Sequence, residues 1–321
     1  MWGRWNSVDR KRMIKETSEV LTRAGFYVSD PDLFQTVNFD IVARRDAMLL
    51  IVKVLTNIDA MDRAIADQMM LVCKHLNAFP LLVGERSNTS ILEEGVVYLR
   101  HTIPVMALGT LMDYFIEGVP PFVLAGPGGP YVNIDGQELK RVRTAKGISL
   151  GNLAKAAGVS RRSIQLYESG GKAMYNVVVK MEEFLGSPIV SPVKALVPVK
   201  EVNKELYKPA HLGGDFAKVV FERFRGLGFV VIPTVKCPFD ALSEDKRTLI
   251  LMGLGQRNRS TVEKAKIMAT LSRIAEKDSV LVMSEGTSKQ NIEGTPVIMK
   301  SELDKFDGTE EVLHILKERK K

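Results

Sequence analysis

Three polar side chains that can recognise nucleobases lie close together in the sequence. They are Arg161, Arg162 and Gln165, and the apolar residues Ile164 and Tyr167 stand at the spacing of the opposite face of a short helix. A guanidinium group can donate a pair of hydrogen bonds to guanine O6 and N7, and a glutamine amide can pair with adenine. The sequence therefore predicts a helix whose outward face can meet base edges.

The residues around this helix predict the elements that would present it. Ser149 is a natural N-cap for a preceding helix, and Ser160 is one for the predicted reading helix. Gly158 can adopt the left-handed conformation that ends the first helix tightly. We expect Ser163 and Glu168 to join the outward face of the second helix. The residues expected to bury the first helix are Leu150, Leu153 and Ala154.

Basic side chains surround the predicted helices and suit contacts with a phosphate backbone, which position a protein without reading sequence. They are Lys140, Arg141, Arg143, Lys146, Lys155 and Lys172. A different interpretation is a helical insert that packs between its neighbours, in which Arg161 and Arg162 are merely solvated.

Residues 135–186 resemble the Cro/C1 family of helix-turn-helix domains, most closely from Ser149 to Tyr167 and in the exit Glu168-x-Gly170. The resemblance implies a third helix that enters the major groove of double-stranded DNA. It implies base contacts by Arg161, Arg162 and Gln165, and phosphate contacts near Ser149, Ser160 and Lys155. Leu150 departs from the family, since many relatives have a glutamine there that supports the reading residues.

A second candidate site consists of Asp40 and Lys53. Asp40 follows Phe39 at the start of an apolar stretch, and Lys53 alone interrupts the apolar run 49–55, which indicates a strand covered on both faces. The order helix, strand, turn, strand, helix, strand recurs near the C-terminus, with matching Gly-Phe, Phe-Asp and Glu-Gly pairs. Asp240 is the equivalent of Asp40. We interpret this recurrence as an internal duplication.

The repeated segment resembles the restriction-endonuclease-like fold, in particular the archaeal Holliday-junction resolvases. In active members, an Asp and a later Glu-x-Lys pattern hold a divalent metal that activates water. Ile51 occupies the Glu position here, and the C-terminal copy has Leu251 and Gly253 at the last two places. We therefore expect Asp40 and Lys53 to form a vestigial ion pair, with no catalytic residue, no metal and no cofactor.

Stretches rich in proline and glycine suggest the domain boundaries. The expected fold is an α/β and all-α multidomain chain, in which a central Cro/C1-type helix-turn-helix bundle is flanked by two duplicated α/β nuclease-like domains with mixed sheets. The expected segments are a first nuclease-like domain, a linker, the helix-turn-helix domain, a second linker and a more degenerate nuclease-like domain. Their bounds are 1–118, 119–130, 131–187, 188–209 and 210–321.

Composition sets further limits. The net charge of +7 suits a nucleic-acid partner, although many other proteins carry as much. Cys73 and Cys237 are isolated, the four histidines are scattered, and no apolar run could span a membrane. The start of the sequence leads into a charged run and not into the apolar core of a signal peptide, so we expect a reducing cytoplasm.

The whole chain also resembles an archaeal family of Cro/C1-type transcriptional regulators, through residues 126–132 and 149–154. We expect a sequence-specific DNA-binding regulator that is not an enzyme and that forms a homodimer, as helix-turn-helix readers usually pair across half-sites. Two other functions fit less well. One is a metal-dependent, structure-specific nuclease or repair factor, and the other is an antitoxin-like or other protein-interaction module.

Overall fold

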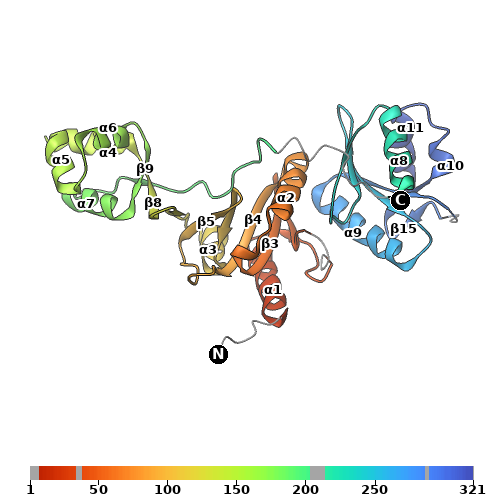
Figure 1. Cartoon of the computed structure of the whole chain (residues 1–321), viewed down its shortest axis with the longest axis horizontal. Helices are drawn as coiled ribbons and strands as arrows, with labels where there is room; N and C mark the ends of the chain where they lie inside the picture. Colours follow the sequence, from red (N-terminus) through yellow and green to blue (C-terminus); the bar gives the residue numbers. More distant parts are fainter. Residues whose placement is uncertain (1–6, 34–37, 203–213, 286–288, 321) are drawn as a thin grey trace. The chain divides into compact units, whose positions relative to one another are not determined.

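The computed structural model of the chain describes residues 7–33, 38–202, 214–285 and 289–320 (Figure 1). The chain forms two compact units. One consists of residues 1–54, 61–80 and 198–321, and the other of residues 55–60 and 81–197. Within the described ranges, no helix has both the length and the apolar character needed to cross a bilayer.

The first unit begins with two helices and three strands of the N-terminal segment. These are α1 (Ser7–Arg23), β1 (Tyr27–Val28), β2 (Ile41–Arg45), β3 (Met48–Asn57) and α2 (Arg63–Leu76). The strands pair antiparallel in the order β1-β2-β3. Gly25 has a positive φ of 83° where the chain reverses after α1, as the sequence predicts. Residues 49–54 of β3 are all buried, so the prediction of a strand covered on both faces is confirmed.

The same unit contains the C-terminal α/β elements. These are α8 (Asp215–Gly226), β11 (Val230–Pro233), β12 (Ala241–Glu244), β13 (Leu249–Gly255), α9 (Arg259–Ala275), β14 (Asp278–Met283), β15 (Asn291–Ile292), β16 (Thr295–Met299), α10 (Lys300–Leu303) and α11 (Thr309–Arg319). They build a six-stranded mixed sheet in the order β11-β12-β13-β14-β16-β15. Its β13-β14 and β14-β16 pairs are parallel and its other pairs antiparallel.

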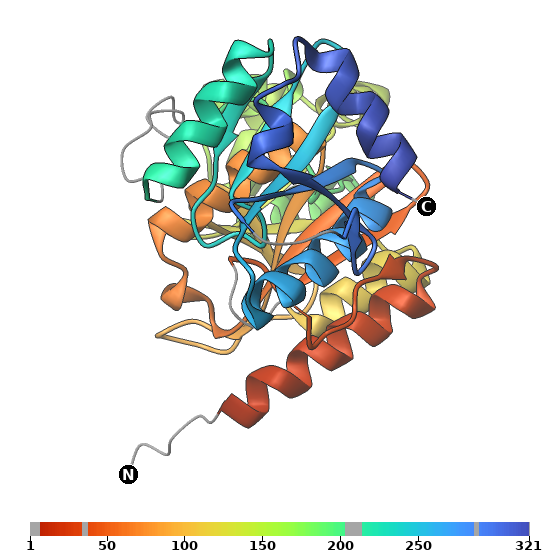
Figure 2. The ribbon, with the colours of Figure 1, turned by 90° about the vertical axis from the view of Figure 1, so that its right-hand side faces the viewer.

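Helices cover both faces of this sheet (Figure 2). Val280 and Val282 of β14 pack in the cluster that includes α8 and α11, whereas Leu281 and Met283 pack in the cluster that includes Ala265 of α9. This alternation along one strand is the two-residue period of a sheet with helices on both sides. The predicted α/β arrangement with a mixed sheet is therefore confirmed for this segment.

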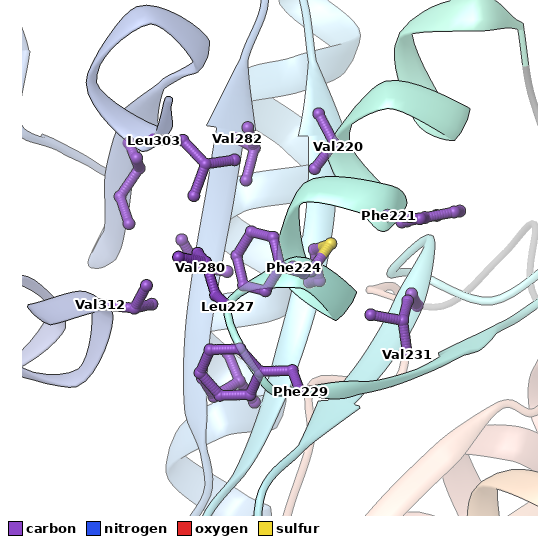
Figure 3. Close-up of a cluster of buried hydrophobic side chains, with 14 of the residues drawn as sticks. Val220, Phe221, Phe224, Leu227, Phe229, Val231, Val280, Val282, Leu303 and Val312 are labelled. Atoms are coloured by element: carbon purple, nitrogen blue, oxygen red, sulfur yellow. The ribbon is translucent and has the colours of Figure 1, made fainter. Parts of the chain in front are cut away.

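Aromatic residues fill the α8 side of the sheet (Figure 3). Phe221 and Phe224 of α8 are almost fully buried. The ring of Phe224 lies 5.4 Å from that of Phe229, centroid to centroid, at an angle of 43°. Phe229 follows Gly228, whose φ of 103° lets the chain turn from α8 back into the sheet.

The second unit starts with the remaining elements of the N-terminal α/β segment. These are η1 (Ile58–Ala60), β4 (Phe79–Arg86), β5 (Val96–Arg100), β6 (Ile103–Met106), α3 (Leu108–Met112) and the π-helical turn η2 (Asp113–Glu117). Strand β6 pairs parallel with β4 and antiparallel with β5. In the C-terminal sheet, β16 pairs in the same two ways with β14 and β15.

The rest of the second unit is a helical bundle beside short antiparallel strands. Its elements are β7 (Val123–Gly126), β8 (Gly129–Ile134), α4 (Gly136–Ala145), α5 (Leu150–Ala157), α6 (Arg161–Glu168), β9 (Gly171–Met174), α7 (Tyr175–Leu185) and β10 (Val190–Ser191). Strand β8 pairs with β7, β9 and β10.

Residues 119–130 are not the irregular linker that the sequence suggests. They include β7 and the turn into β8, and β7 also pairs parallel with β5. The turn is possible because Gly128 and Gly129 have φ values of 88° and 138°. In the described part of the second expected linker, 188–209, residues 190–191 form β10 and residues 192–202 lie outside any helix or strand, as expected of an irregular connector, while Ile189 and Ala195 are buried. Residues 203–209 lie outside the described residues.

Truncating Phe224 to alanine should lower the free energy of unfolding of the C-terminal segment by about 3–5 kcal/mol, because it leaves a cavity in a dense aromatic core. Urea unfolding followed by circular dichroism measures the change. Val219→Ala on the same helix is the matched control, since Val219 is largely exposed and should cost little. Equal losses for the two variants would contradict this account of the core.

Candidate nucleic-acid interface

Helix α6 presents the predicted reading residues to solvent. Arg161, Arg162 and Gln165 are exposed, while Ile164 on the opposite face is fully buried. Tyr167 is partly buried and packs against the same core. The helix is short, so the buried face fixes its orientation, and the three polar side chains remain accessible.

Two serines start the second and third helices of this bundle, as the sequence predicts. Ser149 Oγ accepts a hydrogen bond from the backbone N–H of Asn152, and Ser160 Oγ accepts one from that of Ser163. Gly158 ends α5 with a φ of 69°. The N-termini of α5 and α6 carry the partial positive charge that favours a phosphate group.

Gly151 makes room for Arg161, which the sequence does not reveal. A Cβ atom at Gly151 would lie 2.9 Å from Nε of Arg161. The guanidinium group therefore lies against the first turn of α5, although the residue remains exposed. Glycine inside a helix costs about 0.5–1 kcal/mol relative to alanine, and here it permits this contact between neighbouring helices.

Gly136 allows α4 to begin directly against the end of α6. A Cβ atom there would lie 2.5 Å from the backbone N of Gly170 and 2.6 Å from the carbonyl oxygen of Glu168. Asp135 caps α4 by accepting a hydrogen bond from the backbone N–H of Glu138. The start of α4 thus fixes the exit of α6.

The sequence suggests that Glu168 faces outward, but this prediction is wrong. Its Oε1 lies 2.5 Å from Nε of Arg143, and the two side chains are only 11% and 14% exposed. Arg143 also donates a hydrogen bond to the carbonyl oxygen of Ile148. This ion pair joins α4 to α6 and removes Arg143 from the cations expected to meet phosphate. The reason is tertiary: the end of α6 packs on α4.

Two further cations of the expected phosphate-binding set have intramolecular partners. Arg141 forms an ion pair with Glu138, and its hydrogen bond holds the pKa of that carboxyl below its usual range. Lys146 donates to the carbonyl oxygen of Leu185. Lys140, Lys155 and Lys172 are exposed.

Leu166 is the surface feature of α6 that the sequence analysis misses. It is 60% exposed, although it lies in the sequence between the predicted reading residue Gln165 and the half-buried Tyr167. An apolar side chain on such a helix can contact the methyl group of thymine. The signal was present in the helical period, which places Leu166 off the buried face.

The carboxylate of Asp40 is buried and fully engaged. Its side chain is 3% exposed, and Oδ1 lies 2.6 Å from Nη2 of Arg10 and 3.4 Å from Nζ of Lys53. Its Oδ2 accepts a hydrogen bond from the backbone N–H of Val54, whose carbonyl oxygen accepts one from Nε of Arg10. Burial lowers the pKa of Lys53, while the Asp40 carboxylate opposes that shift. The expected ion pair is present, and Arg10 of α1 completes it.

Asp240 has an equivalent set of contacts. Its Oδ2 accepts a hydrogen bond from the backbone N–H of Leu254 and lies 2.7 Å from Nζ of Lys264. Lys264 also donates to the carbonyl oxygen of Leu254. In both segments, the residue whose backbone N–H donates to the carboxylate also has a carbonyl oxygen that accepts a hydrogen bond from the cation beside that carboxylate. The residue is Val54 in the first segment and Leu254 in the second. The cation comes from α1 in the first segment and from α9 in the second.

Two family models match segments of the chain. Residues 10–121 match the model of the PD-(D/E)XK superfamily domain, and residues 139–190 match a helix-turn-helix model. No solved structure matches the chain.

Full-length relatives occur in several archaea under the name "Putative HTH-type transcriptional regulatory protein". One from Methanosarcina mazei is 36% identical over 317 residues, which covers 96% of this chain and 97% of the relative. Another from Natronomonas pharaonis is 37% identical over 316 residues, covering 97% and 99%. A third from Methanocella arvoryzae is 37% identical over 313 residues, covering 97% of each. The chain belongs to this family.

The PD-(D/E)XK segment of this family member does not fit a divalent metal. A hard cation needs several oxygen ligands. At the first site, Ile51 provides none, and both oxygens of Asp40 already accept hydrogen bonds. Among the described residues, no group of three or more His, Cys, Asp and Glu side chains could hold a metal ion. The cations Arg10 and Lys264 were not found from the sequence, since neither lies at a recognisable spacing from its aspartate.

Replacing Asp40 with asparagine should lower the free energy of unfolding by about 3 kcal/mol, because Arg10 and Lys53 would lose the anion that compensates them in a buried place. Urea unfolding at neutral pH measures the change. Asp215→Asn is the matched control, since the Asp215 side chain is fully exposed. If Asp40→Asn lowered the free energy of unfolding no more than the control does, the ion pairs of Asp40 with Arg10 and Lys53 would not be stabilising contacts.

Proposed function

We propose that this protein is a sequence-specific transcriptional regulator that inserts α6 into the major groove of double-stranded DNA. The observation that carries the proposal is the exposure of Arg161, Arg162 and Gln165 at the N-terminal part of a capped helix, with Ile164 buried behind them. Recognition helices of this type read bases with the residues of their N-terminal half. The names of the archaeal relatives support the same function.

Phosphate contacts in this proposal come from the helix starts and from lysines. The hydroxyl groups of Ser149 and Ser160 each accept a backbone hydrogen bond, and the hydroxyl of Ser149 keeps a proton to donate. Ser163, whose hydroxyl lies 2.9 Å from that of Ser160, belongs to the same edge. Lys155 is exposed on α5 and adds a charge that attracts the backbone without reading sequence.

We further propose that two chains occupy adjacent half-sites of a near-palindromic operator. Helix-turn-helix domains of this kind read one half-site each, and the spacing of one helical turn between half-sites follows from the geometry of the duplex. This pairing concerns the second unit, where the reading helix is located.

Arg161→Ala and Gln165→Ala should each reduce discrimination between operator and unrelated DNA by about 1–3 kcal/mol, the value of one good base contact. Lys155→Ala should weaken binding to every sequence alike and flatten the dependence on salt concentration. Selection from random duplexes followed by titration against the selected operator at several salt concentrations measures both effects. Unchanged site preference in Arg161→Ala and Gln165→Ala would reject α6 as the reading element.

We also propose that the two α/β segments are duplicated nuclease-like domains that serve as a scaffold without enzymatic activity. Three observations support this. The element order of α1 to α2 repeats in α8 to α9, the central parallel and antiparallel pairings repeat, and Asp40 and Asp240 have equivalent contacts. The positive charges of Arg10 and Lys264 stand against the carboxylates that would otherwise bind a metal.

A structure-specific nuclease is the second candidate, favoured by the match to the PD-(D/E)XK model. A cavity of about 520 Å³ lies beside Asp240, whose side chain is 35% exposed, so this site is the more open one. We expect no cleavage of duplex, single-stranded or four-way-junction DNA by the intact protein with Mg²⁺ or Mn²⁺. Metal-dependent cleavage that Asp40→Asn or Asp240→Asn abolishes, while circular dichroism stays native, would establish the nuclease instead.

A further inference from the structure

The two α/β segments correspond residue by residue along the paired parts of their central hairpins, which both lie in the first unit. In the first hairpin Ile41 pairs with Val52, and Arg44 pairs with Leu49. In the second, the equivalent pairs are Ala241 with Met252 and Glu244 with Leu249. Arg44 of β2 and Glu244 of β12 therefore occupy the same place in the two segments.

The C-terminal ends of α2 and α9 also correspond. Each helix ends at a residue in the left-handed conformation, Asn77 after α2 and Glu276 after α9. In each, the next backbone N–H donates to a carbonyl in the last turn, from Ala78 to Cys73 and from Lys277 to Ser272. These are the hydrogen bonds of one type of helix end.

The strand of each segment contacts the C-terminal end of the helix in the other segment. Arg44 of β2 forms an ion pair with Glu276 at 2.5 Å and donates a hydrogen bond to the carbonyl oxygen of Ala275, at the end of α9. Conversely, Glu244 of β12 lies 3.1 Å from Nδ1 of His75, at the end of α2. The strand of each segment thus contacts the helix end of the other. That reciprocity defines the interface of a two-fold symmetric dimer.

Residues that precede the two aspartates also contact one another. The backbone N–H of Asn38 donates to the carbonyl oxygen of Lys236, and its side-chain amide donates to that of Val235 at 2.7 Å. Gln68 of α2 accepts a hydrogen bond from the backbone N–H of Val235. Asn38 is buried, and this pairing of loops satisfies its backbone N–H and its side-chain amide.

We propose that the chain contains its own pseudo-two-fold dimer of nuclease-like domains, in which each segment occupies the pairing surface of the other. The proposal rests on the duplication proposed above. Since one chain satisfies the self-complementary surface in cis, that surface does not accept a second chain. Any pairing of two chains on DNA must then use other surfaces.

Cleavage of the folded full chain tests the pairing. A protease site inserted between Lys200 and Glu201, which are exposed and outside any helix or strand, allows the purified protein to be cut after folding. We expect the two fragments to co-elute in size-exclusion chromatography with light scattering, at a mass equal to that of one intact chain, 35.7 kDa for the natural sequence.

Charge reversal tests the particular contacts. Arg44→Glu with His75→Glu places carboxylates against Glu276 and Glu244, and we expect the dissociation constant of the fragments to rise about tenfold or more. Adding Glu276→Arg and Glu244→Arg should restore co-elution. Arg23→Glu, at an exposed site on α1, is the matched control and should change nothing.

The proposal would be overturned if the fragments separated without any substitution. It would also be overturned if the charge reversals raised the dissociation constant of the fragments no more than Arg23→Glu does. An intact chain whose dimers dissociate with the same reversals would overturn it as well, because the surface would then pair chains in trans. Operator affinity, measured in parallel on the intact variants, separates this question from the reading function. The charge reversals should leave this affinity unchanged. If α6 does not read DNA, no preference for an operator will be found, whatever the outcome of the fragment experiment.

Discussion

A carboxylate that loses contact with water must be compensated where it lies, and this constraint applies to both α/β segments. It is strictest at Asp40, whose side chain is 3% exposed, and weaker at Asp240, whose side chain is 35% exposed. Asp40 and Asp240 each accept a hydrogen bond from a backbone N–H of the neighbouring strand. Each also meets a cation that contacts the carbonyl group of that same residue. The positive charge beside each carboxylate comes from arginine and lysine side chains. At the first site, both oxygens of Asp40 are engaged in hydrogen bonds.

The surface proposed to read DNA, formed by Arg161, Arg162 and Gln165, depends on the contacts that hold α6 in place. Helix α6 has few buried residues, so its position is fixed by Ile164, by the close approach of Gly136 and by the Arg143–Glu168 ion pair. These contacts use the inner face and the last turn of the helix. Its N-terminal half and outer face remain for the arginines and the glutamine, and the helix N-terminus also attracts phosphate.

Reciprocal contacts between the α/β segments give the proposed duplication a physical role. A homodimer of small domains depends on protein concentration, whereas two copies in one chain meet at a high effective concentration. The pairing through Arg44, Glu276, His75 and Glu244 is then present in every molecule. A scaffold of this kind can support a DNA-reading bundle without assembling first.

The sequence by itself determined the local features. The caps at Ser149 and Ser160, the turn at Gly158 and the two-sided burial of residues 49–54 follow from hydrogen bonds and periods within a few residues. Tertiary structure alone decided that Arg10 and Lys264 neutralise the two aspartates, that Glu168 turns inward to Arg143, and that residues 119–130 contribute a strand. Those outcomes depend on which helix ends and strand edges come together across long separations, and side-chain spacing in the sequence carries no record of that proximity.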